Sequence, residues 1–228
     1  MRREPFITGE YYHIYNRGVD KREIFTDYLD VLRFFESLRE FNDIKVLGSL
    51  YQESFRKNNT QLSTRSTKSE KPEPLVEFIA FCVLGNHFHL VVKQMVDGGI
   101  SKFMQKVLGG YTRYFNERHT RSGALFQGKF KSSHIDNDNY LQKVVVYVNL
   151  NFKVHKKKVS FIQPELLSSW CLYVDGIQNS LLKCNIDENI IYESAEKYKE
   201  FAESCVVDII KMRTGKIQDS DIVKVLLE

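Results

Sequence analysis

The stretch that decides the fold is Val76–Val92, which reads VEFIAFCVLGNHFHLVV. Val76–Leu84 is an apolar run of the length of a central strand, Gly85-Asn86 interrupts it, and a second apolar run resumes at Phe88. Two apolar runs joined by so short a turn predict two adjacent antiparallel strands.

His87 and His89 lie one residue apart in the second of these runs. Successive side chains of a strand point to opposite faces of a sheet, so we expect both imidazoles on one face and Phe88 in the core. Two such nitrogens can serve as ligands of one divalent ion. The pair alone is a weak indication, because strand histidines are more often solvated or hydrogen-bonded than bound to metal.

The residues before this stretch predict a strand, a helix and a further strand. Tyr11–Asn16 is aromatic and is closed by Arg17-Gly18, as expected of a strand that runs into a turn. Thr26-Asp27 offers an N-cap for a helix. That helix has apolar residues at threefold and fourfold spacing, namely Leu29, Leu32, Phe35, Leu38 and Phe41. A strand is expected over Val46–Phe55, before a polar insert at 56–74.

The residues after the central stretch predict two helices with a strand between them. Ile100–Phe115 has helical spacing, interrupted by Gly109-Gly110, and Phe126–Ile135 reads as a short strand. Asn139 to about Lys153 is expected to be a helix capped by the polar cluster at 136–138. This order of elements is typical of an α+β fold in which helices pack on an antiparallel sheet.

Length and composition predict a protein with one main domain, located in the cytoplasm. The chain has 228 residues, 43% of them hydrophobic. No stretch approaches the roughly 18 to 20 apolar residues of a membrane span, and the start lacks the apolar core of a signal peptide, so no membrane partner is expected. The four cysteines form no CxxC pair, which disfavours a zinc ribbon or a disulfide framework.

The charge is distributed unevenly along the chain. Residues 187–228 hold ten acidic residues against six basic ones, which leaves +8 on residues 1–186 of a chain whose formal net charge is +4. We expect the basic part to face a polyanion.

The helix expected over Asn139–Lys153 places Tyr140, Tyr147 and Asn151 on one stripe. An amide oxygen is a competent ligand for Mg²⁺ or Mn²⁺, and a phenol one turn away would lie near a phosphate bound to that ion. Taken singly, Tyr147 can equally be a half-buried aromatic residue and Asn151 a residue near a helix end.

Four blocks follow one another along the sequence: YHIYNRG at 12–18, NHFHL at 86–90, LFQGKFK at 125–131 and YVNLN at 147–151. Together, and in this order, they resemble the HUH transposases with a single catalytic tyrosine, the IS200-like family, and specifically its REP-associated tyrosine transposase branch. The block at 86–90 resembles the family's NHxHL core. Val148 and Phe152 depart from the family's usual isoleucine and proline, and Leu84-Gly85 replaces its usual Met-Pro.

The resemblance implies a ferredoxin-like antiparallel sheet with packed helices, the HUH endonuclease fold. It implies a nuclease domain over 1–158, with 159–228 left as a small helical C-terminal appendage. His87, His89 and Asn151 would bind Mg²⁺ or Mn²⁺, and Tyr147 would be the nucleophile. The implied activity is cleavage and strand transfer of hairpin-associated single-stranded DNA through a 5′-phosphotyrosine.

Basic and polar residues around the four blocks are candidate DNA contacts. They are Asn16, Arg17, Lys21, Arg113, Lys129 and Lys131.

Three alternatives remain at this stage. The chain could be a domesticated DNA-binding protein with the same fold but no transposition, or an HUH replication initiator or relaxase. It could also be a hydrolytic metalloenzyme that uses His87, His89 and a carboxylate, in which case Tyr147→Phe would remain active. The sequence does not decide between a monomer and a homodimer.

Overall fold

The computed structural model describes residues 5–45, 73–154, 167–186 and 194–213. Within them lies a four-stranded antiparallel sheet of order β2-β3-β1-β4. The strands are β1 (Tyr11–Arg17), β2 (Val76–Leu84), β3 (His87–Gln94) and β4 (Lys131–Ile135). The expected strand at 46–55 and nearly all of the polar insert lie outside the described residues.

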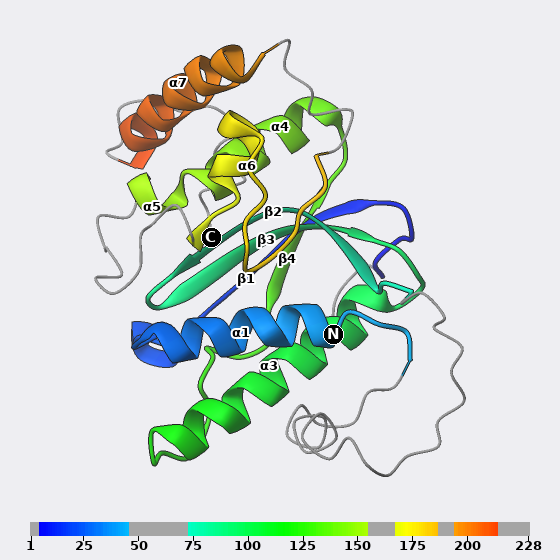
Figure 1. Cartoon of the computed structure of the whole chain (residues 1–228), viewed down its shortest axis with the longest axis vertical. Coiled ribbons are helices and arrows are strands. Elements are labelled where there is room, and N and C mark those ends of the chain that lie inside the picture. The colour runs from blue at the N-terminus through cyan, green and yellow to red at the C-terminus, as the bar shows by residue number, and fades with distance from the viewer. Residues whose placement is uncertain (1–4, 46–72, 155–166, 187–193, 214–228) are drawn as a thin grey trace.

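The helices form a layer on each face of the sheet (Figure 1). The helices are α1 (Tyr28–Glu40), α3 (Gly99–Arg118), α4 (Asp138–Asn149), α5 (Asn151–Val154), α6 (Trp170–Asp175) and α7 (Ala195–Arg213). α1 and α3 cover one face, and α4 crosses the other with α5, α6 and α7 beside it. The order βαββαβ with β1 next to β3 is ferredoxin-like. The predicted α+β fold is therefore confirmed.

Local sequence explains how α1 and α3 begin and how they meet. The side chain of Asp27 caps α1 by accepting a hydrogen bond from the backbone N–H of Asp30. The buried stripe of α1 is Val31, Phe34, Phe35 and Leu38. Leu29, expected on that stripe, is 55% exposed instead.

The Gly109-Gly110 pair does not interrupt α3, which is continuous from Gly99 to Arg118. A Cβ on Gly110 would lie 3.0 Å from the ring of Phe41. Gly110 therefore permits the close approach of α3 to the end of α1.

Two predicted elements are shorter in the structure than expected from the sequence. β4 begins at Lys131, while Phe126 makes only an isolated bridge with Gly18. The helix expected over Asn139–Lys153 is divided, because α4 ends at Asn149 and α5 begins at Asn151. The predicted cap of α4 is present: the Asn137 side chain accepts a hydrogen bond from the N–H of Tyr140.

The segment at 167–186, assigned to the predicted appendage, packs directly on the sheet. The backbone N–H groups of Ser169 and Asn185 donate to the carbonyls of Phe81 and Phe78 on β2. These bonds cover the edge of the sheet that β2 would otherwise leave open. The division at residue 158 stays a prediction.

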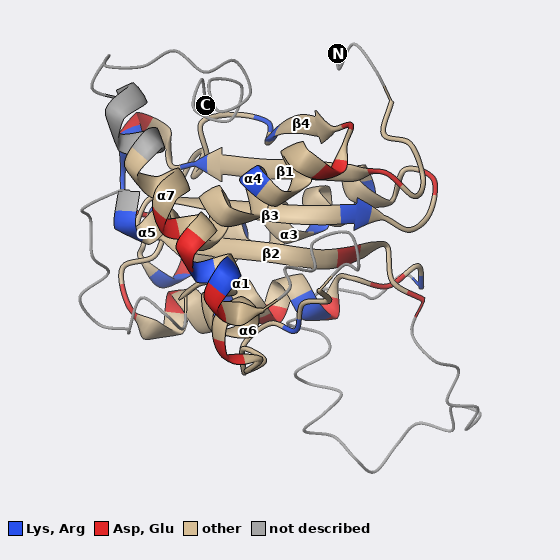
Figure 2. Ribbon diagram, turned by 90° about the horizontal axis from the view of Figure 1, so that it is seen from above, with Lys and Arg blue, Asp and Glu red and all other residues tan. Residues whose placement is uncertain are grey.

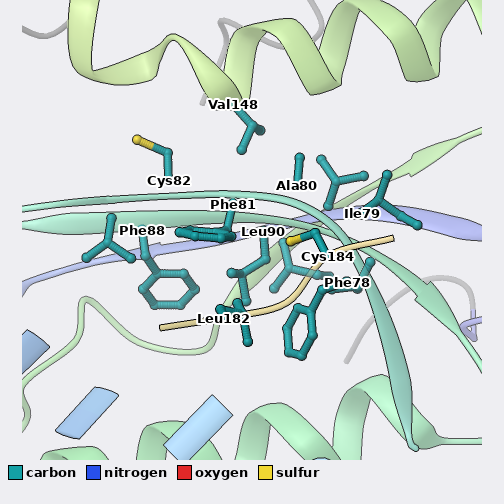
Figure 3. Packing of buried hydrophobic residues seen from close by; sticks show 14 of the residues in the cluster. Phe78, Ile79, Ala80, Phe81, Cys82, Phe88, Leu90, Val148, Leu182 and Cys184 are labelled. Carbon is teal, nitrogen blue, oxygen red and sulfur yellow. The ribbon is translucent and has the colours of Figure 1, made fainter. Parts of the chain in front are cut away.

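The core fills both sides of the sheet (Figure 3). Phe81, Phe88 and Leu90 extend toward the α1 and α3 layer, whereas Cys82 and Val148 meet on the α4 side. All four cysteines are free thiols, and burial raises the pKa of Cys82 to about 12. Among the described helices, none is long and apolar enough to cross a membrane.

Candidate metal and tyrosine centre

α4 lies over one face of the sheet (Figure 2). His87 and His89 of β3 lie on this face, because the His89 ring contacts that of Tyr147 on α4 and residues i and i+2 of a strand share a face. Their ring centroids are 5.2 Å apart and the rings are nearly perpendicular. Phe88, between them, points to the opposite face, where its ring packs 5.1 Å from Phe34 of α1. The predicted alternation of side chains is confirmed.

Tyr147 lies in the last turns of α4, above the histidines. Its ring centroid is 5.6 Å from that of His89 and 6.1 Å from that of His13, and the side chain is 3% exposed. Asn151 begins α5, and its Oδ1 lies 3.3 Å from Nε2 of His87. The break at Leu150 therefore does not carry Asn151 away from the histidines. All four predicted centre residues meet within one chain.

A third histidine, His13 of β1, belongs to the same cluster. Its side chain is fully buried, and its Nε2 lies 2.9 Å from Nδ1 of His89. The sequence placed His13 in a family block and assigned it no role. Its position on the face shared with Tyr15 was a usable signal, but only the pairing of β1 with β3 brings it to His89.

Both candidate ligand histidines are contacted at Nδ1. His13 contacts Nδ1 of His89, and Oδ1 of Asn86 lies 2.6 Å from Nδ1 of His87. Such contacts leave Nε2 of each ring as the atom to face a metal ion.

The donor set fits a divalent cation. Oδ1 of Asn151 and Nε2 of His87 are 3.3 Å apart, near the ~3 Å between neighbouring ligands of an octahedral ion with bonds of about 2.1 Å. If Nδ1 of His87 carries the proton, Nε2 of His87 and Oδ1 of Asn151 are both hydrogen-bond acceptors that face each other. A cation bound between them would offset their repulsion. Nδ2 of Asn151 is buried with no hydrogen-bond partner among the described residues. The predicted third ligand is the Asn151 amide, and the described residues contain no group of three His, Cys, Asp or Glu suited to a metal.

Two of the predicted DNA contacts flank this centre. Arg17 lies opposite His87 in the β1–β3 register, on the same face. Lys131 lies opposite Tyr15 in the β1–β4 register, with its Nζ 5.7 Å from the Tyr15 ring. Tyr15 in turn stacks at 5.8 Å on His89. A basic edge thus borders the histidines.

The other predicted contacts have different positions. Asn16 is 5% exposed, and its side chain bonds to the Gly128 carbonyl and the Arg17 N–H, which fits a structural role. Lys129 is exposed in a loop, and Lys21 is exposed at the end of the short 3-10 helix η1 (Val19–Lys21). Arg113 is exposed on α3, across the sheet from the histidines, so it lies on another surface.

Comparison with known proteins gives a family match and a structural likeness. Residues 51–151 match the family model described as "Transposase IS200 like", a range that includes His87, His89, Tyr147 and Asn151. No curated protein matches the chain. A solved structure titled "Structure of the REP associates tyrosine transposase bound to a REP hairpin" is similar with 13% identity and a TM-score of 0.47, covering 86% of this chain and 95% of that one.

Proposed function

We propose that this chain, whose residues 51–151 match the family of IS200-like transposases, cuts and rejoins single-stranded DNA through a covalent bond to Tyr147. The observation that carries the proposal is the convergence of Tyr147, His87, His89 and Asn151 on one face of the sheet.

In the proposed reaction Oη of Tyr147 attacks the phosphorus of the scissile phosphodiester. The phenol loses its proton, the new P–Oη bond forms, and the bond from phosphorus to the 3′-oxygen breaks. The products are a 5′-phosphotyrosine and a 3′-hydroxyl, which takes up a proton. Attack by another 3′-hydroxyl reverses the step, so strands are rejoined without ATP.

A phenol with an ordinary pKa near 10 is a weak nucleophile at neutral pH. A bound Mg²⁺ or Mn²⁺ would polarise the phosphate and offset its charge. His87, His89 and Asn151 would hold this ion. Tyr147 contributes position, because its ring is packed against His89 and His13 and is therefore held beside the ligands before DNA arrives.

The proposed substrate is hairpin-associated single-stranded DNA. The four sequence blocks resemble the REP-associated branch, which acts on hairpin DNA. On this resemblance we propose the same substrate for the present chain. Arg17 and Lys131 would contact phosphates beside the centre, and the partly exposed Tyr15 ring between them could stack on a base. Because one chain supplies the histidines and the tyrosine, we propose that a monomer cleaves.

Denaturing electrophoresis with end-labelled hairpin oligonucleotides tests this function. We expect a protein–DNA adduct that survives SDS, requires Mn²⁺ or Mg²⁺, and is lost with EDTA. Cleavage without any adduct would instead indicate a hydrolase. Tight hairpin binding with neither cleavage nor adduct would indicate a domesticated DNA-binding protein.

A further inference from the structure

Each histidine of the centre is contacted at Nδ1 by a side chain to which the family resemblance assigns no role. We propose that Asn86 and His13 are positioning residues that fix His87 and His89 as neutral imidazoles protonated on Nδ1, with Nε2 facing the ion. The inference rests on the proposed function, since it concerns the same metal site.

The orientation of the Asn86 amide follows from its second contact. Nδ2 of Asn86 lies 3.0 Å from the carbonyl oxygen of Lys21. A carbonyl oxygen can only accept, so the amide nitrogen must face Lys21 and Oδ1 must face His87. Oδ1 is itself only an acceptor, so Nδ1 of His87, at 2.6 Å, must donate. A neutral imidazole that donates from Nδ1 has its lone pair on Nε2.

The backbone around Asn86 keeps the Lys21 carbonyl in place. Asp20 and Lys21 both have positive φ, 55° and 58°, a conformation that costs free energy in residues other than glycine. The N–H of Gly18 donates to the carbonyl of Asn86 over 2.9 Å. A Cβ on Gly18 would lie 2.3 Å from the carbonyl oxygen of Arg22, so only glycine allows this turn to close. The turn is thus a fixed support for the Asn86 amide.

In the proposal, His13 accepts a hydrogen bond from Nδ1 of His89, as Asn86 does from Nδ1 of His87. Nε2 of His13 and Nδ1 of His89 are 2.9 Å apart, so one of the two nitrogens donates and the other accepts. Only donation by Nδ1 of His89 leaves Nε2 of His89 able to bind a metal ion. His13 is 0% exposed and stacks on both His89 and Tyr15, so its ring is held by packing on two sides.

Long-range ¹H–¹⁵N NMR of histidine-labelled, metal-free protein reads the tautomers directly, at a pH where the imidazoles are neutral. We expect His87 and His89 as Nδ1–H tautomers, whereas free imidazole side chains favour Nε2–H. Signals are assigned by the loss of one resonance in His87→Gln and in His89→Gln. An Nε2–H tautomer at either position would overturn the inference for that histidine, with no variant of Asn86 or His13 needed.

Substitution of the two positioning residues then tests their effect on the ion. Asn86→Ala and His13→Phe are expected to abolish the Nδ1–H tautomer of the partner and to weaken Mn²⁺ binding, followed by EPR, about 10- to 100-fold. His13→Gln keeps an acceptor facing Nδ1 of His89 and should restore both readouts at that histidine. Unchanged Mn²⁺ affinity in folded Asn86→Ala or His13→Phe would contradict the proposed role.

His134→Gln and Asn116→Ala are matched controls, because these residues bond to Glu10 and Gly123 away from the centre. Both should bind Mn²⁺ as the wild type does. The inference and the proposed function fail separately. Nδ1–H tautomers and Mn²⁺ binding without a DNA adduct would support the inference and contradict the proposed function. A DNA adduct formed by a protein with Nε2–H tautomers would support the proposed function and contradict the inference.

Discussion

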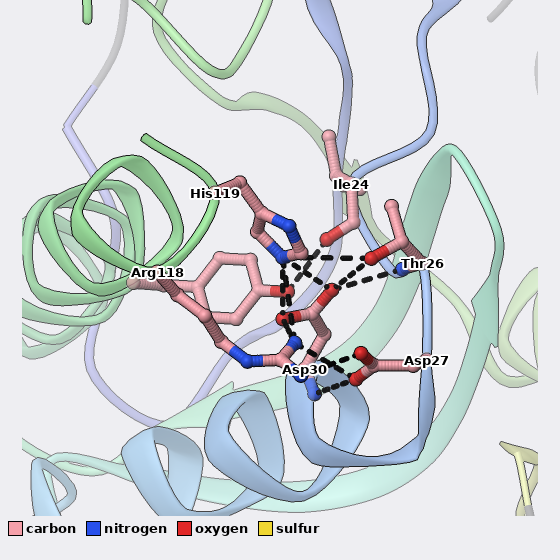
Figure 4. Close-up of polar contacts among 7 residues, drawn as sticks. Ile24, Thr26, Asp27, Asp30, Arg118 and His119 are labelled. Atoms are coloured by element: carbon pink, nitrogen blue, oxygen red, sulfur yellow. Dashed lines mark hydrogen bonds and ion pairs between the residues drawn. The ribbon is translucent and has the colours of Figure 1, made fainter. Parts of the chain in front are cut away.

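Two polar clusters that include histidine lie among the described residues, one on each side of the sheet, and they differ in how their charges are matched. On the α1 and α3 side, Asp30 is 0% exposed and its carboxylate is surrounded by donors (Figure 4). They are the N–H and hydroxyl of Thr26, Nη1 of Arg118 and Nε2 of His119, at distances of 2.6 to 3.1 Å. On the α4 side, His13, His87 and His89 lie beside two amides, Asn86 and Asn151, and the phenol of Tyr147.

This difference separates a structural cluster from a functional one. The Asp30 cluster is complete: each carboxylate oxygen has donors, and the cation is supplied by Arg118 of α3. It therefore joins the start of α1 to the end of α3. In the histidine cluster, the Asn151 oxygen faces His87 and the buried Nδ2 of Asn151 has no partner among the described residues. We propose that a cation from outside the chain completes this arrangement.

The largest effect is expected from Tyr147→Phe, which removes only the nucleophilic oxygen from the histidine cluster. Adduct formation should fall by at least about 10⁴-fold, because no other group replaces the attacking atom. DNA affinity and stability should change little. The measurement is the single-turnover rate of adduct formation on a hairpin oligonucleotide.

Tyr140→Phe is the control for this change, since Tyr140 lies two turns earlier on α4 and is also buried. It should keep the wild-type rate. A normal rate of cleavage in Tyr147→Phe would establish the hydrolytic alternative.

Asp30→Ala should break the other cluster and leave the metal site intact. The free energy of unfolding is expected to fall by about 2–3 kcal/mol, because Arg118 and His119 lose a fully buried partner; the value is below that of a wholly buried pair since Arg118 is partly exposed. Urea denaturation measures the loss, and Mn²⁺ affinity of the folded protein should not change.

Glu36→Ala supplies the comparison for a partly exposed ion pair, because Glu36, whose side chain is 42% exposed, bonds to Arg33 within α1. Its expected cost is about 0.5 kcal/mol or less. Equal costs for the two variants would mean that the Asp30 cluster does not hold α1 and α3 together.

Lys131→Ala, compared with Arg113→Ala, tests whether DNA binds on the histidine side of the sheet or on the α3 side. We expect affinity for single-stranded hairpin DNA to fall up to about tenfold and the salt dependence of binding to decrease by about one counterion. Arg113→Ala, on α3 across the sheet, should alter neither quantity. Fluorescence anisotropy at several salt concentrations measures the DNA affinity of both variants. A larger loss of affinity in Arg113→Ala than in Lys131→Ala would place the DNA on the α3 side.

The smallest effect concerns how the Arg118–Asp27 ion pair, which joins α3 to the start of α1, affects stability at acid pH. The hydrogen bond from Arg118 lowers the pKa of Asp27 below its ordinary value of 3.8. A folded-state pKa below the unfolded one stabilises the fold above that ordinary value, and this contribution is lost as the pH falls through the lowered pKa. The urea midpoint should therefore decrease less steeply below about pH 4 in Asp27→Asn than in the wild type. Asparagine retains the helix cap, so an unchanged acid slope would assign the pH dependence to other groups.

The sequence by itself determined the features that depend on chain geometry over a few residues. The period of two in a strand placed His87 and His89 on one face, and the helical period brought Tyr147 and Asn151 to the same side of α4 and α5. The caps at Asp27 and Asn137 were readable because capping is a local hydrogen bond. Leu29 was misplaced, since periodicity gives the spacing of a stripe but not where burial begins.

Only the tertiary structure decided which distant residues meet. His13 reaches His89 because β1 pairs with β3 and not with β2, and Arg118 reaches Asp30 because α1 and α3 share one face of the sheet. The segment at 167–186 covers the edge of β2 because that edge has unpaired backbone groups to satisfy. These contacts follow from burial and strand order, which depend on the whole chain folding at once, and no local pattern encodes them.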